Sequence, residues 1–415
     1  MRIKKPRGTR DFSAREMEKR EYVENIIISV IRSYNYKRVL TPTFEHVELF
    51  ELKSGEEIQE HLYVFEDKSG RRLCLRPEAT ASVCRMFAEE LRSERLPLKL
   101  FYSCPMFRYE RPQKGRYREF WQIGVELIGT DRPEADAEVI SIAVNSLKKL
   151  GLEFTLEIGH LGVLRALMNE LGIKREKQDH LITLIDKKDT RKIKKCVKDK
   201  TLLRLIELRG DKKIMDVAES ILIDYNNTWD ELKNLKSVLS WLDVLGMEYT
   251  IDLGIARGLE YYTGMVFEIR VPDLGAQNQI CGGGRYDNLI ELFSGINVPA
   301  SGFAFGFDRV MEALEFQSIH IPKRMTDVVI APVNEDMQDD AMKIASQLRE
   351  YFTVDMDLMG RKLNRIIGYA DEMNSRYVII IGPEDMEEEM VTVRDMKTRE
   401  QKKVRIEDIL QEITQ

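Results

Sequence analysis

Two strand-like segments that follow each other closely constrain the fold most. Residues 98–108 and 118–128 both alternate in the manner of strands, and the loop between them is rich in glycine, proline, lysine and arginine. Strands joined by so short a connection pair as an antiparallel hairpin. The chain is therefore expected to contain an antiparallel sheet whose central hairpin carries a basic loop.

The second strand of this hairpin presents polar side chains on one face. Because strand side chains alternate with a period of two, Phe120, Gln122, Gly124 and Glu126 point the same way, and Gly124 leaves open space beside the two polar groups. Arg108, at the end of the first strand, would lie near this surface. An amide, a carboxylate and a guanidinium could together bind a ligand that carries a positive and a negative charge, such as an amino acid. A half-exposed sheet with cross-strand ion pairs explains the pattern equally well.

The whole chain, with 415 residues, is too long for a single compact core. Ser13 and Glu16 form a capping-box pattern ahead of a long amphipathic helix, and alternating strands and helices after residue 325 are typical of an α/β unit. We expect an α+β domain with an antiparallel sheet flanked by helices, a mostly helical insertion and a C-terminal α/β domain. The predicted segments are 1–164 and 246–318 for the α+β domain, 165–245 for the insertion and 325–415 for the last domain.

The cysteine and histidine positions and the apolar runs argue against a zinc or redox site, a metal-dependent hydrolase and a membrane protein. The five cysteines are scattered without a Cys-x-x-Cys pair, and the five histidines lack metal-ligand spacing. No apolar run approaches the roughly 20 residues that cross a bilayer, and the basic start of the chain has no apolar segment, so we expect a cytoplasmic protein without membrane contact.

A local basic segment stands out against the net charge of -6. Residues 187–200 contain eight lysines and arginines and only two aspartates. Such a segment can attract the phosphates of a nucleic acid, although a solvated surface helix explains it nearly as well.

Arginines are the candidates for binding phosphate or carboxylate, because the chain has no P-loop and no complete dinucleotide-binding fingerprint. Arg257 stands close to Tyr261 and Tyr262 in a segment flanked by glycines, which permit close approach to a ligand but also suit a turn or bulge. Arg309 begins a helix after a strand of small residues, a place where an isolated arginine is usually a surface residue.

Several segments resemble the motifs of histidyl-tRNA synthetases, which are class II aminoacyl-tRNA synthetases. Residues 107–122 are similar to motif 2, residues 257–264 and 283–287 to the two histidine-specific motifs, and residues 306–309 to motif 3. Pro42 fits motif 1, and residues 7–12 are similar to the start of the family. The resemblance covers essentially the whole chain, and the two histidine-specific segments carry the assignment to histidine.

The resemblance implies a two-step reaction. The enzyme would activate L-histidine with ATP to form histidyl-adenylate and pyrophosphate, and then transfer histidine to the 3′ end of tRNA(His). The implied catalytic residues are Arg108 and Arg257. The implied histidine-binding residues are Glu78, Ala79, Thr80, Arg108, Gln122, Glu126, Arg257, Tyr261 and Tyr262. The implied ATP-binding residues are Arg108, Glu110, Arg116 and Arg309.

The same resemblance implies cofactors and partners. Mg²⁺ would accompany ATP, with protein ligands that the sequence leaves unassigned. The motif 2 loop, the helical insertion and the last domain would contact tRNA(His), and two chains would form a homodimer through motif 1.

Three alternatives compete with this interpretation. A catalytically silent paralogue, similar to the regulatory subunit of ATP phosphoribosyltransferase, would usually lack the C-terminal domain and the reactive arginines, whereas this chain keeps Arg108, Arg257 and Arg309. A class II synthetase for another amino acid is disfavoured by residues 257–264. An RNA-binding module without catalysis would not need the clustered carboxylates and tyrosines.

Overall fold

The computed structural model describes residues 3–51, 60–111, 116–257, 261–275 and 278–414. The chain forms two compact units, Met1–His320 and Ile321–Gln415. Within the described ranges, no helix combines the length and the apolar character that a membrane span requires.

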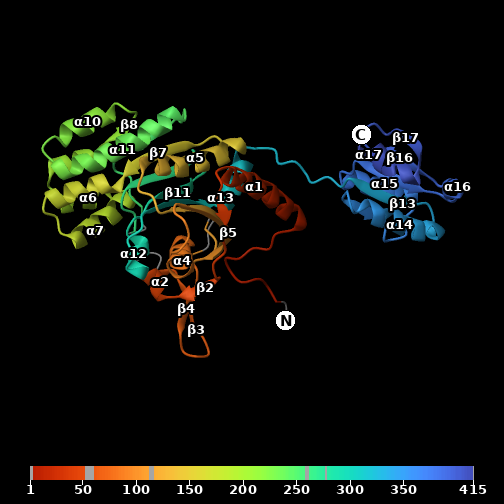
Figure 1. The fold of residues 1–415 in the computed structure, drawn as a ribbon, viewed down its shortest axis with the longest axis horizontal. Coiled ribbons are helices and arrows are strands. Elements are labelled where there is room, and N and C mark those ends of the chain that lie inside the picture. Colours follow the sequence, from red (N-terminus) through yellow and green to blue (C-terminus); the bar gives the residue numbers. More distant parts are fainter. Residues whose placement is uncertain (1–2, 52–59, 112–115, 258–260, 276–277, 415) are drawn as a thin grey trace. The chain divides into compact units, whose positions relative to one another are not determined.

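A nine-stranded mixed sheet forms the centre of the first unit (Figure 1). Its strands, in spatial order, are β1 (Lys37–Arg38), β5 (Leu98–Phe107), β6 (Glu119–Ile128), β12 (Ala300–Gly306), β11 (Gln279–Arg285), β10 (Met265–Arg270), β7 (Thr155–His160), β9 (Thr250–Asp252) and β8 (Arg209–Gly210). The predicted hairpin is confirmed as the antiparallel pair β5–β6, in which Phe107 lies opposite Glu119. The part of the sheet that carries the candidate residues is therefore antiparallel.

Helices cover this sheet. The predicted first helix is α1 (Ala14–Ser33), and the capping box of Ser13 and Glu16 is present. Helix α5 (Pro133–Lys149) packs against β11 and β12, α1 packs against α5, and α13 (Phe307–Phe316) continues from β12 and packs against β6.

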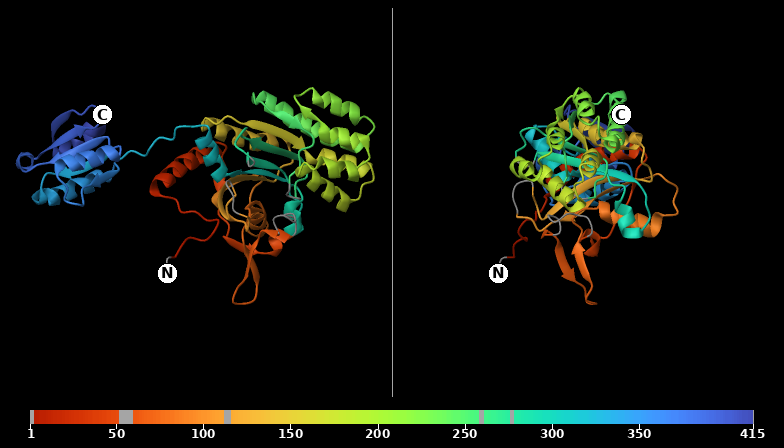
Figure 2. Two further views of the ribbon diagram at one scale, coloured as in Figure 1. Left: turned by 180° about the vertical axis from the view of Figure 1, so that it is seen from behind. Right: turned by 90° about the vertical axis from the view of Figure 1, so that its left-hand side faces the viewer.

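The segment around Pro42 is divided between two sheets. β1 forms one edge of the large sheet, whereas β2 (Phe44–His46) forms an edge of a three-stranded sheet with β4 (Arg72–Leu75) and β3 (Tyr63–Glu66). Both strands lie at sheet edges, which suits the proline between them because it has no N–H group to donate to a neighbouring strand. The β3–β4 hairpin projects from the first unit (Figures 1 and 2). Helix α4 (Thr80–Met86) follows β4 and ends in a π-helix, Phe87–Leu91.

The mostly helical character predicted for residues 165–245 is confirmed, and the helices gather at one end of the first unit (Figure 1). They are α6 (Leu161–Glu170), α7 (Arg175–Asp186), α8 (Thr190–Cys196), α9 (Lys200–Glu207), α10 (Ile214–Ile221) and α11 (Asn226–Val244). Buried leucines such as Leu202 and Leu235 pack between them. Two shorter helices, α2 (Glu48–Glu51) and α12 (Leu289–Ser294), lie elsewhere in this unit.

The second unit has the predicted α/β pattern. Its five-stranded sheet has the order β14 (Val354–Met356), β13 (Val328–Pro332), β15 (Tyr377–Ile381), β16 (Met390–Asp395) and β17 (Gln401–Arg405). The first three strands are parallel, and β16 and β17 are antiparallel. Helices α14 (Gln338–Leu348) and α17 (Ile409–Thr414) share a hydrophobic core on one face, and α15 (Leu363–Glu372) belongs to the core on the other. A short helix α16 (Pro383–Glu387) precedes β16.

A buried ion pair joins helix α5 to the large sheet. Both Asp136 oxygens accept hydrogen bonds from the Arg285 guanidinium, at 3.0 and 2.8 Å, and the two side chains are almost completely buried. Arg285 also donates to the Thr130 carbonyl and to Asp287. A buried charge that loses its partner is strongly destabilising, because neither water nor another charge replaces the lost interaction.

We therefore expect Asp136→Ala to lower the free energy of unfolding of the first unit by about 3 kcal/mol, since Arg285 would remain buried without its main counter-charge. Glu134→Ala on the same helix is the control. Glu134 pairs with Arg132 in a solvent-exposed position, so its loss should have a much smaller effect. Urea unfolding followed by tryptophan fluorescence measures both, and equal effects would contradict the assignment.

Candidate active site

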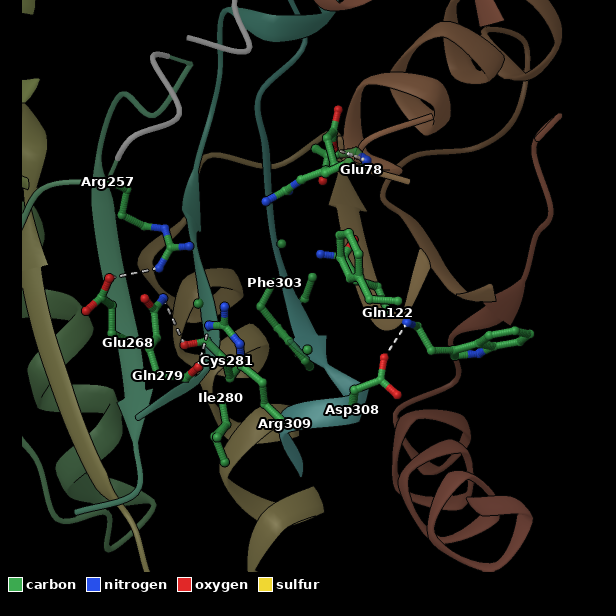
Figure 3. Close-up of a pocket in the computed structure, with 18 of the residues that line it drawn as sticks. Glu78, Gln122, Arg257, Glu268, Gln279, Ile280, Cys281, Phe303, Asp308 and Arg309 are labelled. Atoms are coloured by element: carbon green, nitrogen blue, oxygen red, sulfur yellow. Dashed lines mark hydrogen bonds and ion pairs between the residues drawn. The ribbon is translucent and has the colours of Figure 1, made fainter. Parts of the chain in front are cut away.

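A cavity of about 320 Å³ lies against the β6, β12 and β11 strands of the large sheet (Figure 3). Its walls come from segments that are far apart in the sequence: the β4–α4 turn, both strands of the β5–β6 hairpin, the segment before β10 and the start of α13. Antiparallel neighbours in the sheet bring these segments together. In Figure 3, Arg257 and Arg309 stand on one side of the cavity, and Glu78 and Gln122 on the other.

Most of the candidate residues line this cavity. Those that do are Glu78, Thr80, Arg108, Glu110, Arg116, Gln122, Arg257, Tyr261, Tyr262 and Arg309. The other two, Ala79 and Glu126, are buried directly behind its wall. The sheet thus collects in one place residues that the sequence presents in five separate segments.

Two buried carboxylates lie at one end of the cavity. The Glu78 carboxylate accepts hydrogen bonds from the backbone N–H groups of Thr80 at 2.6 Å and Ala81 at 3.1 Å, at the start of α4. Glu126 accepts hydrogen bonds from the Thr80 hydroxyl at 2.7 Å and from the Tyr286 hydroxyl. Thr80 therefore connects the two acids.

Burial controls the protonation of both acids. Desolvation raises the pKa of Glu126 to about 8, against the lowering effect of its hydrogen bonds from Tyr286 and Thr80. Desolvation also raises the pKa of Glu78, although the N–H groups of Ala81 and Thr80 and the charge of Arg108 oppose this shift. The pair can accept a positively charged or hydrogen-donating ligand with little competition from water.

Arg108, Arg116 and Arg309 make a second region of the cavity cationic, and Arg108 connects it to the acids, since its Nε donates to the Pro77 carbonyl at 3.0 Å, next to Glu78. Burial lowers the pKa of Arg309, and the nearby charges of Arg108 and Arg116 lower it further. Arg309 donates to the Gln279 carbonyl at 2.9 Å, and Arg116 lies 3.4 Å from a Glu110 oxygen. Like charges held this close favour an anionic ligand, because a polyphosphate would relieve their mutual repulsion.

Arg257 is held between an acid and a glycine strand. Its Nη1 donates to Glu268 at 3.1 Å (Figure 3). Its guanidinium lies 5.8 Å from the ring centre of Tyr262. A Cβ at Gly282 would overlap this guanidinium, so the glycine allows Arg257 to lie flat against β11. Asp186, at the end of helix α7, also lines this part of the cavity.

One expectation about the hairpin face is wrong. The space beside Gly124 is not open, because Tyr102 lies directly opposite it in the β5–β6 register and the tyrosine ring fills the position. The alternation of strand side chains gives the face of a residue but not the size of its neighbour on the next strand. Tyr102 lines the cavity in place of the ligand space expected there.

Several lining residues were not among the candidates. Tyr286 stands in the segment 283–287, and its hydroxyl reaches Glu126. Asp186 and Glu268 carry no sequence signal, because only the tertiary structure brings them to Arg257. Arg285 of the same motif as Tyr286 turns away from the cavity toward Asp136. The loop residues 112–115 of motif 2, including Gln113, and the motif residues 258–260 lie outside the described part of the chain.

Comparison with known proteins is consistent with this geometry. The family described as "Histidyl-tRNA synthetase" matches residues 8–310, and the family described as "Anticodon binding domain" matches residues 327–415. The chain belongs to the histidyl-tRNA synthetase family. It is 44% identical to the histidine–tRNA ligase of Methanocaldococcus jannaschii over 98% of both chains, and 44% identical to that of Archaeoglobus fulgidus over 99% of both.

Solved structures of histidyl-tRNA synthetases share the fold. The apo enzyme of S. aureus is 29% identical, with a TM-score of 0.74 over 99% of this chain and 100% of its own. The enzyme of Nostoc sp. has a TM-score of 0.82 over 100% of this chain and 99% of its own, at 22% identity. A Bacillus halodurans protein described both as an ATP phosphoribosyltransferase regulatory subunit and as a histidyl-tRNA synthetase is 27% identical, with a TM-score of 0.78 over 92% of this chain and 98% of its own.

The raised pKa of Glu126 predicts a pH dependence of stability. Between pH 4.5 and about 8, the folded protein keeps a proton on Glu126 that the unfolded chain has released, so the free energy of unfolding falls as the pH rises through this window. Glu126→Gln removes this contribution. We expect the urea midpoint of the parental protein to fall more steeply over this pH range than that of the variant.

Glu119→Gln is the matched control, because Glu119 is exposed on the same strand. It should keep the parental slope. Identical slopes for the parental protein and Glu126→Gln would show that Glu126 does not titrate in this range.

Proposed function

We propose that this chain activates L-histidine with ATP and transfers it to tRNA(His). The observation that carries the proposal is the meeting of Arg108, Arg257 and Arg309 around one cavity whose other end holds the buried acids Glu78 and Glu126. Such a cavity fits a ligand pair that is polyanionic on one side and cationic on the other. ATP and an amino acid have these properties.

The first step would be an in-line displacement at the α-phosphorus of ATP. A carboxylate oxygen of histidine attacks, the bond to the β-phosphate breaks, and pyrophosphate leaves with that electron pair. Arg108 would bridge the histidine carboxylate and the α-phosphate, and Arg257 would add positive charge to the same phosphate. Fixed cations stabilise the charge that develops in the transition state without needing to reorganise.

The ATP contacts divide along the cavity. Glu110 would face adenine, and Arg116 and Arg309 would hold the distal phosphates or stack on the base. Their closeness supports this role, because Arg108 and Arg116 both act on the pKa of Arg309. Mg²⁺ would arrive with ATP, held mainly by phosphates and water as this ion prefers. The described residues contain no group of three or more acids, histidines or cysteines that could hold a metal ion.

Histidine would lie over the buried acids. Its ammonium would meet Glu78, Thr80 and Gln122, and within the described residues the buried Gln122 Oε1 has no hydrogen-bond donor. Its imidazole would meet Glu126, Tyr261 and Tyr262, with Ala79 forming part of the floor. A site whose buried polar groups are satisfied only by the correct ligand rejects analogues that leave them unpaired.

The second step needs tRNA. A ribose hydroxyl at the 3′ end would attack the histidyl carbonyl, and AMP would leave. All eight basic side chains of residues 187–200 are exposed, which suits contact with the phosphates of the tRNA stem. The second unit, which matches the anticodon-binding family, would contact the anticodon arm. We further place the protein in the cytoplasm.

A homodimer would form through the segment that carries motif 1. Leu40 is 71% exposed and Phe44 54% exposed, on either side of Pro42, and Phe65 of β3 stacks edge-on against Phe44. Exposed apolar side chains beside a sheet edge favour contact with a second chain.

Histidine-dependent exchange of pyrophosphate into ATP tests the first step. We expect Arg108→Ala and Arg257→Ala each to reduce exchange at least about a hundredfold, since each substitution removes a positive charge that would stabilise the reacting phosphate. Binding of tRNA(His), measured by filter retention, should survive in both. The control Arg132→Ala removes an arginine that is exposed beside Glu134 and should exchange at the parental rate.

Parental rates in both active-site variants would overturn the roles of Arg108 and Arg257. A parental protein without exchange that instead stimulates an ATP phosphoribosyltransferase would favour the regulatory alternative.

The basic segment predicts salt-dependent tRNA binding. Replacing Lys187, Lys195 and Lys198 together with alanine should weaken tRNA(His) binding. The slope of log affinity against log salt should become shallower by about 2, because fewer counterions are released on binding when phosphate contacts are lost. A triple variant at the exposed Lys37, Lys68 and Arg95 is the control. An unchanged slope would assign residues 187–200 to a solvated surface.

A further inference from the structure

The N-terminal segment, residues 7–12, crosses the base of the loop between β5 and β6. The Gly8 carbonyl accepts a hydrogen bond from the Arg118 N–H at 2.9 Å, and the Arg7 carbonyl lies 3.5 Å from the Arg118 guanidinium. Arg118 closes the base of the loop, since its own carbonyl accepts from the Arg108 N–H at 3.0 Å. The N-terminal segment is therefore attached to the stem from which Arg108 extends.

Gly8 is specifically suited to this crossing. Its φ of +87° lies in the left-handed region that glycine favours, and a Cβ there would lie 2.7 Å from Cγ of Arg118. The Arg118 side chain that passes so close to Gly8 donates to the Glu110 carbonyl at 3.2 Å. Arg118 thus links the N-terminal segment to both sides of the loop.

A second attachment is made through Asp308. Its Oδ1 accepts hydrogen bonds from Arg10 at 2.6 Å and from Arg20 at 2.7 Å, and its Oδ2 accepts from the Trp121 backbone N–H at 2.8 Å. Asp308 and Arg20 are both buried. One carboxylate therefore joins the N-terminal segment, helix α1, strand β6 and the start of α13.

The neighbours of these anchors are the proposed ATP ligands. Asp308 directly precedes Arg309 in the chain. The Arg10 guanidinium lies 3.5 Å from the ring centre of Tyr117, the residue after Arg116. Tyr117 itself lines the cavity. A shift of Arg10 would therefore change the positions of both Arg116 and Arg309.

We propose that Gly8 and Arg10 are positioning residues for ATP. They hold the loop stem and the start of α13 so that Glu110, Arg116 and Arg309 face the nucleotide. This inference rests on the proposed function, since it takes these three residues as ATP contacts. In the described part of the chain, residues 7–12 contact Arg118, Tyr117 and Asp308 rather than the buried acids Glu78 and Glu126, so we expect the larger effect on ATP.

Arg10→Ala in the full-length protein tests the proposal. We expect the KM for ATP in histidine-dependent exchange to rise about tenfold, while the KM for histidine stays within about twofold of the parental value. Arg10→Lys should give an intermediate KM for ATP, because it keeps the charge beside Asp308 but loses the planar contact with Tyr117.

Lys5→Ala is the matched control. Lys5 belongs to the same end of the chain but pairs with Asp11 at the surface, 3.4 Å away. It should keep parental KM values for both substrates.

Gly8→Ala is an independent second variant, and it should also raise the KM for ATP selectively. Calorimetric titration with histidine shows whether each variant retains a folded site, and titration with ATP measures the loss directly. Parental ATP affinity in both Arg10→Ala and Gly8→Ala would overturn the proposal, as would equal losses for ATP and histidine. Absence of exchange in the parental protein would instead count against the proposed function, while the ATP titrations would still test the positioning role.

Discussion

The convergence of Arg108, Arg116 and Arg309 on one cavity is a constraint that the sheet of the first unit has to meet. Three guanidinium groups in a partly buried cavity repel one another, and the pKa of Arg309 is lowered by burial and by the two other charges. Side chains on mobile loops would move apart. Here two of them extend from the stem and loop of one hairpin and the third from a helix that continues the neighbouring strand. Because these segments are anchored to the antiparallel sheet, the three cations stay close together, and an anionic ligand would offset their repulsion.

Paired charges surround this cavity and fix its walls. Asp136 holds Arg285, Glu268 holds Arg257, and Asp308 holds two arginines together with a backbone N–H group. Asp136 and Asp308 join segments that are distant in the sequence, whereas Glu268 lies only 11 residues from Arg257. Because such pairs are costly to break, they define the positions of their neighbours more sharply than apolar packing would. Glu126 differs, because it accepts hydrogen bonds from the hydroxyl groups of Thr80 and Tyr286, and desolvation raises its pKa in spite of them.

Much of this fold could be predicted from residue patterns. The β5–β6 hairpin, the capped first helix, the helical character of residues 165–245 and the C-terminal α/β unit all follow from local periodicity. Local periodicity could not predict what fills a space across strands, so the room expected beside Gly124 is occupied by Tyr102. It also gave no reason to expect Asp186 or Glu268 at Arg257. The family resemblance supplied the candidate residues, whereas their partners depend on tertiary contacts that no motif encodes.

Asp186 has a consequence for how this chain could have diversified. It is the last residue of α7, within the helical segment, yet it forms part of the wall beside Arg257 and directly precedes the exposed basic stretch. The helical segment is therefore not a detachable appendage. A chimaera that exchanged it for the corresponding piece of a relative would also exchange one acidic group of the cavity wall, so the basic surface and the charge beside Arg257 would be inherited together.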